Sequence, residues 1–198
     1  MDDTLNLENS FLVATPAMQD PRFRQSVIYM CAHDEGGAMG IVVNKAKRGA
    51  LGGAIHLSDM LEQVGVEGQP NVADTPVLEG GPVDMERGFV LHTGEYQTPE
   101  ATLPISDTLM LTSTREVLDA LVTDKAPARA VLAIGYAGWG EGQIEEELAQ
   151  SAWIVCRPED PETLDKLVFG EGLDAKWTDA LAVLGIEPSQ LAAMGGSA

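Results

Sequence analysis

The chain has 198 residues, with 12 basic and 31 acidic side chains, a formal charge of −19 at pH 7 and a pI near 4.2. This charge repels phosphate backbones and anionic lipid headgroups, which argues against direct nucleic-acid binding and against a membrane surface as partner. The 44% hydrophobic content and the length indicate one globular domain over 1–198, with flexible tails at about 1–10 and 195–198.

The compartment is predicted from the N-terminal segment and from the two cysteines. The first eight residues carry acids in place of a basic, then apolar, export signal, and no run of 18 apolar residues follows. Cys31 and Cys156 lie far apart inside apolar runs, a pattern typical of buried free thiols. These features predict a cytoplasmic protein.

Short β-rich runs dominate the first half of the chain. They lie at 11–15, 26–32, 39–44, 76–79, 88–92 and 108–111. Gly36-Gly37 predicts a hairpin between the second and third runs. The basic, glycine-rich segment 45–53 is expected to be a mobile loop.

Helical patterns alternate with strands further along and dominate the end. A short helix is expected over 56–65 with Ser58 as N-cap, and a capping-box pattern at 113–116 begins a helix that runs through Val122. The later elements are a strand at 129–137, a helix at 142–150, a strand at 152–156, helices after Asp160-Pro161 and after Asp174, and a last short turn at Pro188. Helices concentrated in the C-terminal half predict an α+β fold.

A glycine-rich run at 135–142 lies between a predicted strand and a predicted helix, where backbone N–H groups can bind phosphate. Gln143 stands where a dinucleotide motif has its third glycine, and the glutamates that begin the helix would repel a phosphate. We therefore interpret the run as a strained structural turn that orients Trp139, and we expect Glu145, Glu146 and Glu147 on the exposed helix face.

No complete catalytic or metal-binding pattern is present. Cys31 and His33 would share one face of a regular strand, but the sequence lacks a CxxC pair, an HExxH helix, a GxSxG elbow and an SxxK pair. His33 and His92 are the candidate general acids or bases. We predict no metal, no cofactor and no assigned catalytic residue, and we favour a non-enzymatic role.

Several motifs, taken in order, resemble the YqgE/AlgH family of small bacterial proteins over most of the chain. They lie at 14–23, 26–27, 31–33, 37–44, 80–83, 87–92 and 135–140, the last followed by Gln143, Glu145, Glu147 and Trp153. The resemblance implies an α+β domain with a bent mixed sheet folded towards a pseudo-barrel and with helices packed on it. It supplies no reaction; some members are labelled transcriptional regulators, although no DNA-binding helix can be read here. Ala46 stands where the family usually has proline, so the following loop is expected to be freer.

The leading hypothesis is a regulatory or interaction protein that acts through a protein partner. The candidate groove for a partner or ligand consists of His33, Asn44, Gly80, Gly81, Arg87, His92, Trp139, Gln143 and Glu147. The alternative is a small-ligand-binding protein or enzyme with a pocket around His33, Asn44, Gly80-Gly81, Arg87 and Gln143, where Arg87 holds an anionic group. A third reading, direct DNA binding, predicts a steep dependence of affinity on salt.

Overall fold

The computed structural model describes residues 5–194, and its contacts group them into two compact units. Unit 1 comprises residues up to Asn44 together with those from Ala137 onward, and unit 2 spans Lys45–Tyr136. Each unit has its own buried hydrophobic cluster. The boundaries 1–198 expected for a single domain stay a prediction.

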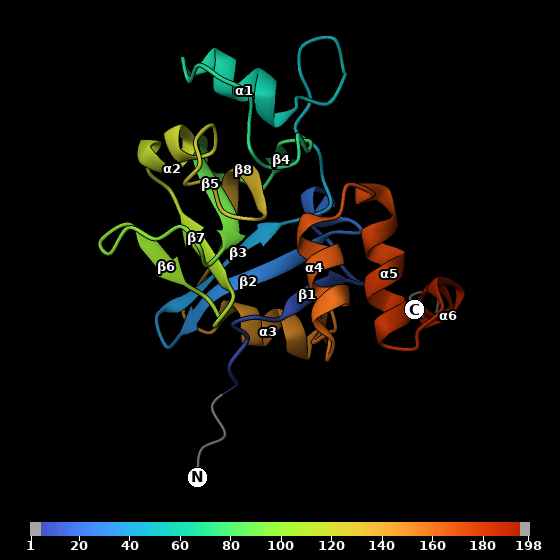
Figure 1. The fold of residues 1–198 in the computed structure, drawn as a ribbon. Coiled ribbons are helices and arrows are strands. Elements are labelled where there is room, and N and C mark those ends of the chain that lie inside the picture. The colour runs from blue at the N-terminus through green and yellow to red at the C-terminus, as the bar shows by residue number, and fades with distance from the viewer. Residues whose placement is uncertain (1–4, 195–198) are drawn as a thin grey trace. The chain divides into compact units, whose positions relative to one another are not determined.

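The strands of unit 1 form an antiparallel array (Figure 1). Its strands are β1 (Phe11–Ala14), β2 (Val27–Asp34), β3 (Gly37–Val42), β9 (Trp153–Cys156) and the end of β8 (Ala130–Gly140). The pairing order is β8-β3-β2-β1-β9. The predicted hairpin joins β2 to β3, since the turn at 35–36 connects paired Asp34 and Gly37.

The helices of unit 1 come almost entirely from the C-terminal part of the chain. They are η1 (Pro21–Phe23), α3 (Gln143–Ala149), α4 (Pro161–Phe169), η2 (Leu173–Ala175), α5 (Lys176–Val183) and α6 (Pro188–Met194). As predicted, the Asp160 side chain caps α4 by accepting a hydrogen bond from the Thr163 N–H at 2.7 Å. Helix α5 packs beside α4 and against β1, β2 and β9 (Figure 1).

Unit 2 contains the remaining strands and two helices. They are α1 (Leu57–Gln63), β4 (Leu78–Glu79), β5 (Val83–Thr93), β6 (Thr102–Pro104), β7 (Leu109–Thr112), α2 (Arg115–Ala120) and the first part of β8. The order is β6-β7-β5-β8, and β4 pairs with β8 in parallel. Apolar side chains of both helices, including Leu61 and Val117, share one core with Val90 and Leu132 of the strands.

The predicted α+β class, the mixed sheet and the C-terminal concentration of helices are confirmed. Predictions at the starts of two helices were wrong. The N-cap of α1 is His56, whose N–H donates to Asp59, while Ser58 lies inside the helix and bonds Asp74. The run expected to be a turn before α3 is strand as far as Gly140, because its backbone pairs with β3.

The segment 45–53, which we expected to be a mobile loop, has backbone pairing over its first residues. Its backbone pairs at Ala46 with Leu78, and Arg48 pairs with Ala54. The Lys47 N–H donates to the Val77 carbonyl at 2.7 Å. The first residues of this segment therefore pair with a strand far away in the sequence, although the composition of the segment predicts no pairing.

The ends of the chain carried two further expectations. Residues 1–4 and 195–198 of the predicted tails lie outside the described residues. Within 5–10, Leu7 and Ser10 are fully buried, because the Asn9 N–H and the Ser10 carbonyl bond Met30 of β2 and draw this segment onto the strand. The last turn at Pro188 is a helix, α6.

Candidate functional site

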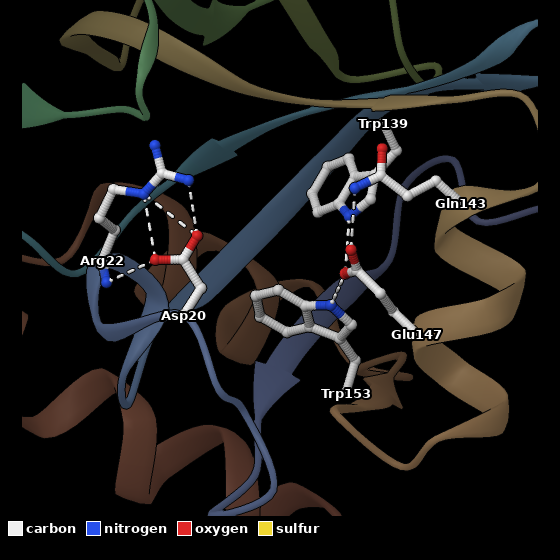
Figure 2. Close-up of polar contacts among 6 residues, drawn as sticks. All are labelled: Asp20, Arg22, Trp139, Gln143, Glu147 and Trp153. Atoms are coloured by element: carbon white, nitrogen blue, oxygen red, sulfur yellow. Dashed lines mark hydrogen bonds and ion pairs between the residues drawn. The ribbon is translucent and has the colours of Figure 1, made fainter.

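A carboxylate between two tryptophans is the centre of the polar network in unit 1 (Figure 2). Glu147 of α3 accepts hydrogen bonds from the indole N–H of Trp139 at 3.0 Å and from that of Trp153 at 2.7 Å. Both indoles are buried, with 7% and 3% exposure, and they meet edge to face. The bonds tie α3 to β8 and β9 through one side-chain acceptor.

Gln143 completes this network from one helical turn earlier. Its amide Nε2 donates to the second oxygen of Glu147 at 3.0 Å, and its Oε1 accepts from the Gly140 N–H at 3.1 Å. The prediction that Glu147 lies on the exposed helix face is therefore wrong, because its carboxylate accepts from the indole N–H groups of two buried tryptophans. The three predicted site residues Trp139, Gln143 and Glu147 do come together.

His33, at the end of β2, is held in one tautomer. Its Nδ1 accepts from the Leu7 N–H at 3.2 Å, which leaves the proton on Nε2, and Nε2 donates to Glu145 at 2.9 Å. The imidazole side chain is only 5% exposed, whereas the Glu145 side chain is 46% exposed. His33 is thus fixed in position and has one polar edge directed at an accessible carboxylate.

A cavity of about 680 Å³ opens beside this pair. Its acidic lining consists of Asp34, Glu35, Glu141 and Glu145, and Leu5 supplies an apolar edge. We call it the acidic hollow. It contains His33 but none of Asn44, Trp139, Gln143 and Glu147, so the predicted groove residues of unit 1 belong to separate environments.

Asn44, the last residue of unit 1 before unit 2 begins, acts on the backbone ahead of β2. Its Oδ1 accepts from the Val27 N–H at 2.8 Å, and its Nδ2 donates to the Gln25 carbonyl at 2.8 Å. Gln25 has a φ of 51°, a left-handed conformation that costs a non-glycine residue energy. The hydrogen bonds of Asn44 therefore hold Gln25 in a strained backbone conformation.

The predicted residues of unit 2 form two structural contacts. Gly80 and Gly81 lie against the strand backbone at Gly135, and a Cβ at Gly80 would overlap the Gly135 carbonyl oxygen. Arg87 donates to the Ser113 hydroxyl at 2.7 Å and stacks on Phe89. Gly80-Gly81 and Arg87 were expected to share a pocket with His33, Asn44 and Gln143; the structure places these two sets in different units.

His92 is fully buried in unit 2 and is engaged on both ring nitrogens. Nδ1 donates to the Thr93 carbonyl at 2.9 Å, and Nε2 accepts from the Thr112 hydroxyl at 2.8 Å. Burial lowers the pKa of His92, because the charged form loses its hydration. A buried neutral imidazole with both nitrogens occupied serves the packing of β5 on β7.

Three structural features were missed by sequence reasoning. Lys176 is 2% exposed, although its position in an amphipathic helix predicts nothing unusual. Asp20 and Arg22 form a bidentate ion pair with contacts of 2.6–3.1 Å, which Figure 2 shows. Arg24 and Trp177 line one cavity although 153 positions separate them. Only the Asp20-Pro21 turn signal gave a local hint of any of these.

Both cysteines are buried free thiols, as predicted. Burial raises the pKa of the Cys156 thiol to about 11 and raises that of Cys31 further, so both are protonated at neutral pH. Within residues 5–194, no group of three His, Cys, Asp or Glu side chains is arranged to hold a metal ion. None of the helices that the structure describes is long and apolar enough to cross a membrane.

The fold and these contacts define a class: an α+β protein with a mixed sheet, whose first unit is tied together by a Trp–Glu–Trp network. The AlgH-like family model matches residues 11–189, and the chain belongs to this family. A protein of Caulobacter vibrioides named "UPF0301 protein" is 43% identical over 198 residues, covering 100% of this chain and 96% of the relative. A "UPF0301 protein" of Paracoccus denitrificans is 42% identical over 200 residues, covering both chains completely.

Two solved structures have similar folds. The solution structure of the AlgH protein from Pseudomonas aeruginosa has a TM-score of 0.73 at 34% identity and covers 100% of this chain and 99% of its own. The crystal structure of a protein from Corynebacterium diphtheriae has a TM-score of 0.54 at 20% identity over 78% of each chain. The second likeness concerns the fold alone. The names of these relatives assign no reaction to the family.

Proposed function

We propose that this chain is a cytoplasmic, non-enzymatic regulatory protein that acts by binding a protein partner through the acidic hollow. The observation that carries the proposal is the combination of a preformed cavity of about 680 Å³ with four carboxylates and a fixed imidazole in its lining. The partner it fits is a protein segment rich in Lys and Arg.

Charge supports a basic partner. Opposite charges on two surfaces speed association and set the orientation of the complex, and a chain of net charge −19 attracts basic segments before contact. Leu5 at the edge of the hollow is 42% exposed and can contact the apolar stems of Lys and Arg side chains.

The polar side chains outside the hollow support a non-enzymatic role. Trp139, Gln143 and Glu147 bond one another, and Asn44 bonds the backbone. His92 uses both ring nitrogens inside the core. Groups that are already occupied by the fold hold its elements in place, whereas a general acid or base needs access to a substrate proton.

The test is capture from native cytoplasm followed by binding measurements with the purified candidate. We expect the wild-type chain to bind a basic protein in about 0.15 M salt, and the double variant Glu35→Gln/Glu141→Gln to bind it at least about tenfold more weakly, because the hollow loses two of its charges. The matched control is Glu62→Gln/Glu67→Gln, which removes two exposed charges from residues that do not line the hollow.

Equal affinity of the wild type and both double variants for every captured protein would contradict the proposal. It would also fail if the purified chain turned over a substrate and Arg87→Ala or His92→Ala abolished that turnover with the fold intact by circular dichroism.

A further inference from the structure

A second cavity in unit 1, of about 350 Å³, has the opposite chemistry to the acidic hollow. Pro16, Met18 and the indole of Trp177 form its apolar side, and Thr15, Arg24 and Gln25 contribute polar groups. No acidic residue lines it, whereas three other cavities formed by described residues all contain carboxylates. Among these four cavities, in a chain with 31 acids, it is the one with a cation and without an acid.

The walls of this cavity are held in place by bonds that leave its interior free. The indole N–H of Trp177 donates to the Ala14 carbonyl at 2.9 Å, which fixes the ring against the end of β1. The Thr15 hydroxyl donates to the Ser151 carbonyl at 2.6 Å and accepts from the Ala17 N–H at 3.1 Å. A ligand therefore meets a formed site and need not order it first.

Arg24 has a free guanidinium. Its neighbour Arg22 is occupied by Asp20, whereas the Arg24 side chain makes no hydrogen bond or ion pair with any residue from 5 to 194. A guanidinium offers five N–H donors in a planar fork that fits a carboxylate with two parallel bonds. The cavity thus has a cation available for an anionic group.

Backbone strain lies at the same place. Gln25 lines the cavity and has a φ of 51°. Asn44 holds this conformation, because its side chain bonds both the Gln25 carbonyl and the Val27 N–H. A left-handed non-glycine residue costs about 1–3 kcal/mol, and such residues cluster at ligand-binding positions. The Asn44 hydrogen bonds keep Arg24 and Gln25 beside Trp177, although the left-handed backbone of Gln25 costs energy.

We propose that this cavity binds a small organic carboxylate, with its apolar body against Trp177 and Met18 and its carboxylate on Arg24. The volume lies near the lower end of the ~300–1,000 Å³ range of ligand pockets, so it admits one ring or branched chain and excludes a dinucleotide. The carboxylate belongs either to a free acid or to the C-terminus of a peptide, because both present the same group to Arg24. This site is separate from the acidic hollow and does not depend on the partner proposed there.

The experiment is a titration of the full chain with phenylacetate in about 0.15 M salt, monitored by two-dimensional ¹H–¹⁵N NMR. The chain has three tryptophans, so the indole N–H signal that Trp177→Phe removes identifies Trp177. We expect phenylacetate to shift this signal and the Gln25 amide. Acetate lacks the apolar body and phenylethylamine carries the opposite charge, so we expect neither to do so at equal concentration.

Arg24→Gln is the decisive variant, because Arg24 is exposed and its loss leaves the core intact. We expect it to weaken phenylacetate binding by about tenfold or more, the usual effect of losing a charge-assisted bond, and Arg24→Lys to weaken it less. Lys125→Gln removes one exposed positive charge outside the cavity and is the matched control; its affinity should equal that of the wild type.

A dipeptide ending in phenylalanine, with a free or an amidated C-terminus, distinguishes the two sources. Tighter binding of the free-acid peptide than of phenylacetate identifies a peptide end, and the reverse identifies a free acid; both support the site. The proposal is overturned if neither phenylacetate nor the free-acid dipeptide shifts the Trp177 signal. It is also overturned if Arg24→Gln binds phenylacetate as tightly as Lys125→Gln does.

Discussion

Lys176, at the start of α5, shows how one side chain can donate hydrogen bonds to backbone carbonyls near the end of a strand and near the end of a helix. Its Nζ donates to the Val43 carbonyl at 2.9 Å and to the Val168 carbonyl at 3.0 Å, near the ends of β3 and α4. Burial lowers the pKa of Lys176 to about 7, because the ammonium loses its hydration. A neutral amine has two N–H groups, which match the two carbonyls.

We expect Lys176→Met to lower the free energy of unfolding by about 2 kcal/mol at pH 9, since two buried carbonyls lose their donor. In the wild type, the pKa of Lys176 rises from about 7 in the folded chain to an ordinary 10.5 in the unfolded chain. The unfolded chain therefore binds more protons between these values, and this residue makes the wild type more stable as pH rises from 7 to 10.5. Below pH 7 its full desolvation cost is present.

Urea unfolding of both proteins at pH 6, 7.5 and 9 measures this effect. The contribution of the other titrating groups cancels in the difference between wild type and Lys176→Met, and that difference should grow with pH. A difference that is constant from pH 6 to pH 9 would show that Lys176 does not change its protonation on unfolding.

Glu147 is the second residue whose effect can be measured directly. We expect Glu147→Ala to lower the free energy of unfolding by about 3 kcal/mol, because the buried N–H groups of Trp139 and Trp153 lose their acceptor. Glu146→Ala removes the neighbouring exposed carboxylate and should change stability by no more than about 0.5 kcal/mol. Circular dichroism during urea unfolding gives both values; equal effects of the two variants would refute the anchoring role.

At the scale of elements, the glycines around β8 determine how closely two backbones approach. Gly135 has a φ of 75°, and a Cβ there would overlap the Gly81 carbonyl oxygen and lie 2.9 Å from that of Val83. Gly80 faces Gly135 with the same constraint. Gly135, the first glycine of the run at 135–142, thus serves strand packing in unit 2.

Gly135→Ala should therefore destabilise the protein by about 3 kcal/mol, the sum of a left-handed backbone cost and a steric overlap with backbone that cannot move. Gly53→Ala is the control in the same unit, because a Cβ added there would have no other atom within 4 Å. Its stability should differ from the wild type by no more than about 0.5 kcal/mol. Thermal unfolding of both variants tests this, and equal melting temperatures would contradict the close approach.

At the scale of the whole molecule, the charge of −19 is distributed unevenly. Acids such as Asp160 cap helices, and others line the acidic hollow, while the cavity at Arg24 has none. The composition therefore predicted an acidic surface and argued against nucleic-acid and anionic-lipid partners. It could not show that one cavity is an exception, because that depends on which segments meet there.

Local patterns were sufficient for most elements. Asp160-Pro161 predicts the start of α4 because a cap and a proline act within one helical turn, and Gly36-Gly37 predicts the hairpin because two glycines favour a tight turn. The prediction was wrong where a distant partner decides: the run before α3 extends as strand because β3 supplies hydrogen bonds. The pairing of Ala46 and Lys47 with residues near Val77 was likewise not predicted.

The sequence by itself determined the α+β class, the buried free thiols, the order of most elements and the membership of the AlgH-like family, because these follow from short-range patterns and composition. Tertiary structure alone decided that Glu147 bridges two indoles, that Lys176 is buried and that Arg24 and Trp177 line one cavity. These contacts join residues that the chain brings together only when it folds, and the energy of a buried polar group depends on the partner it finds there.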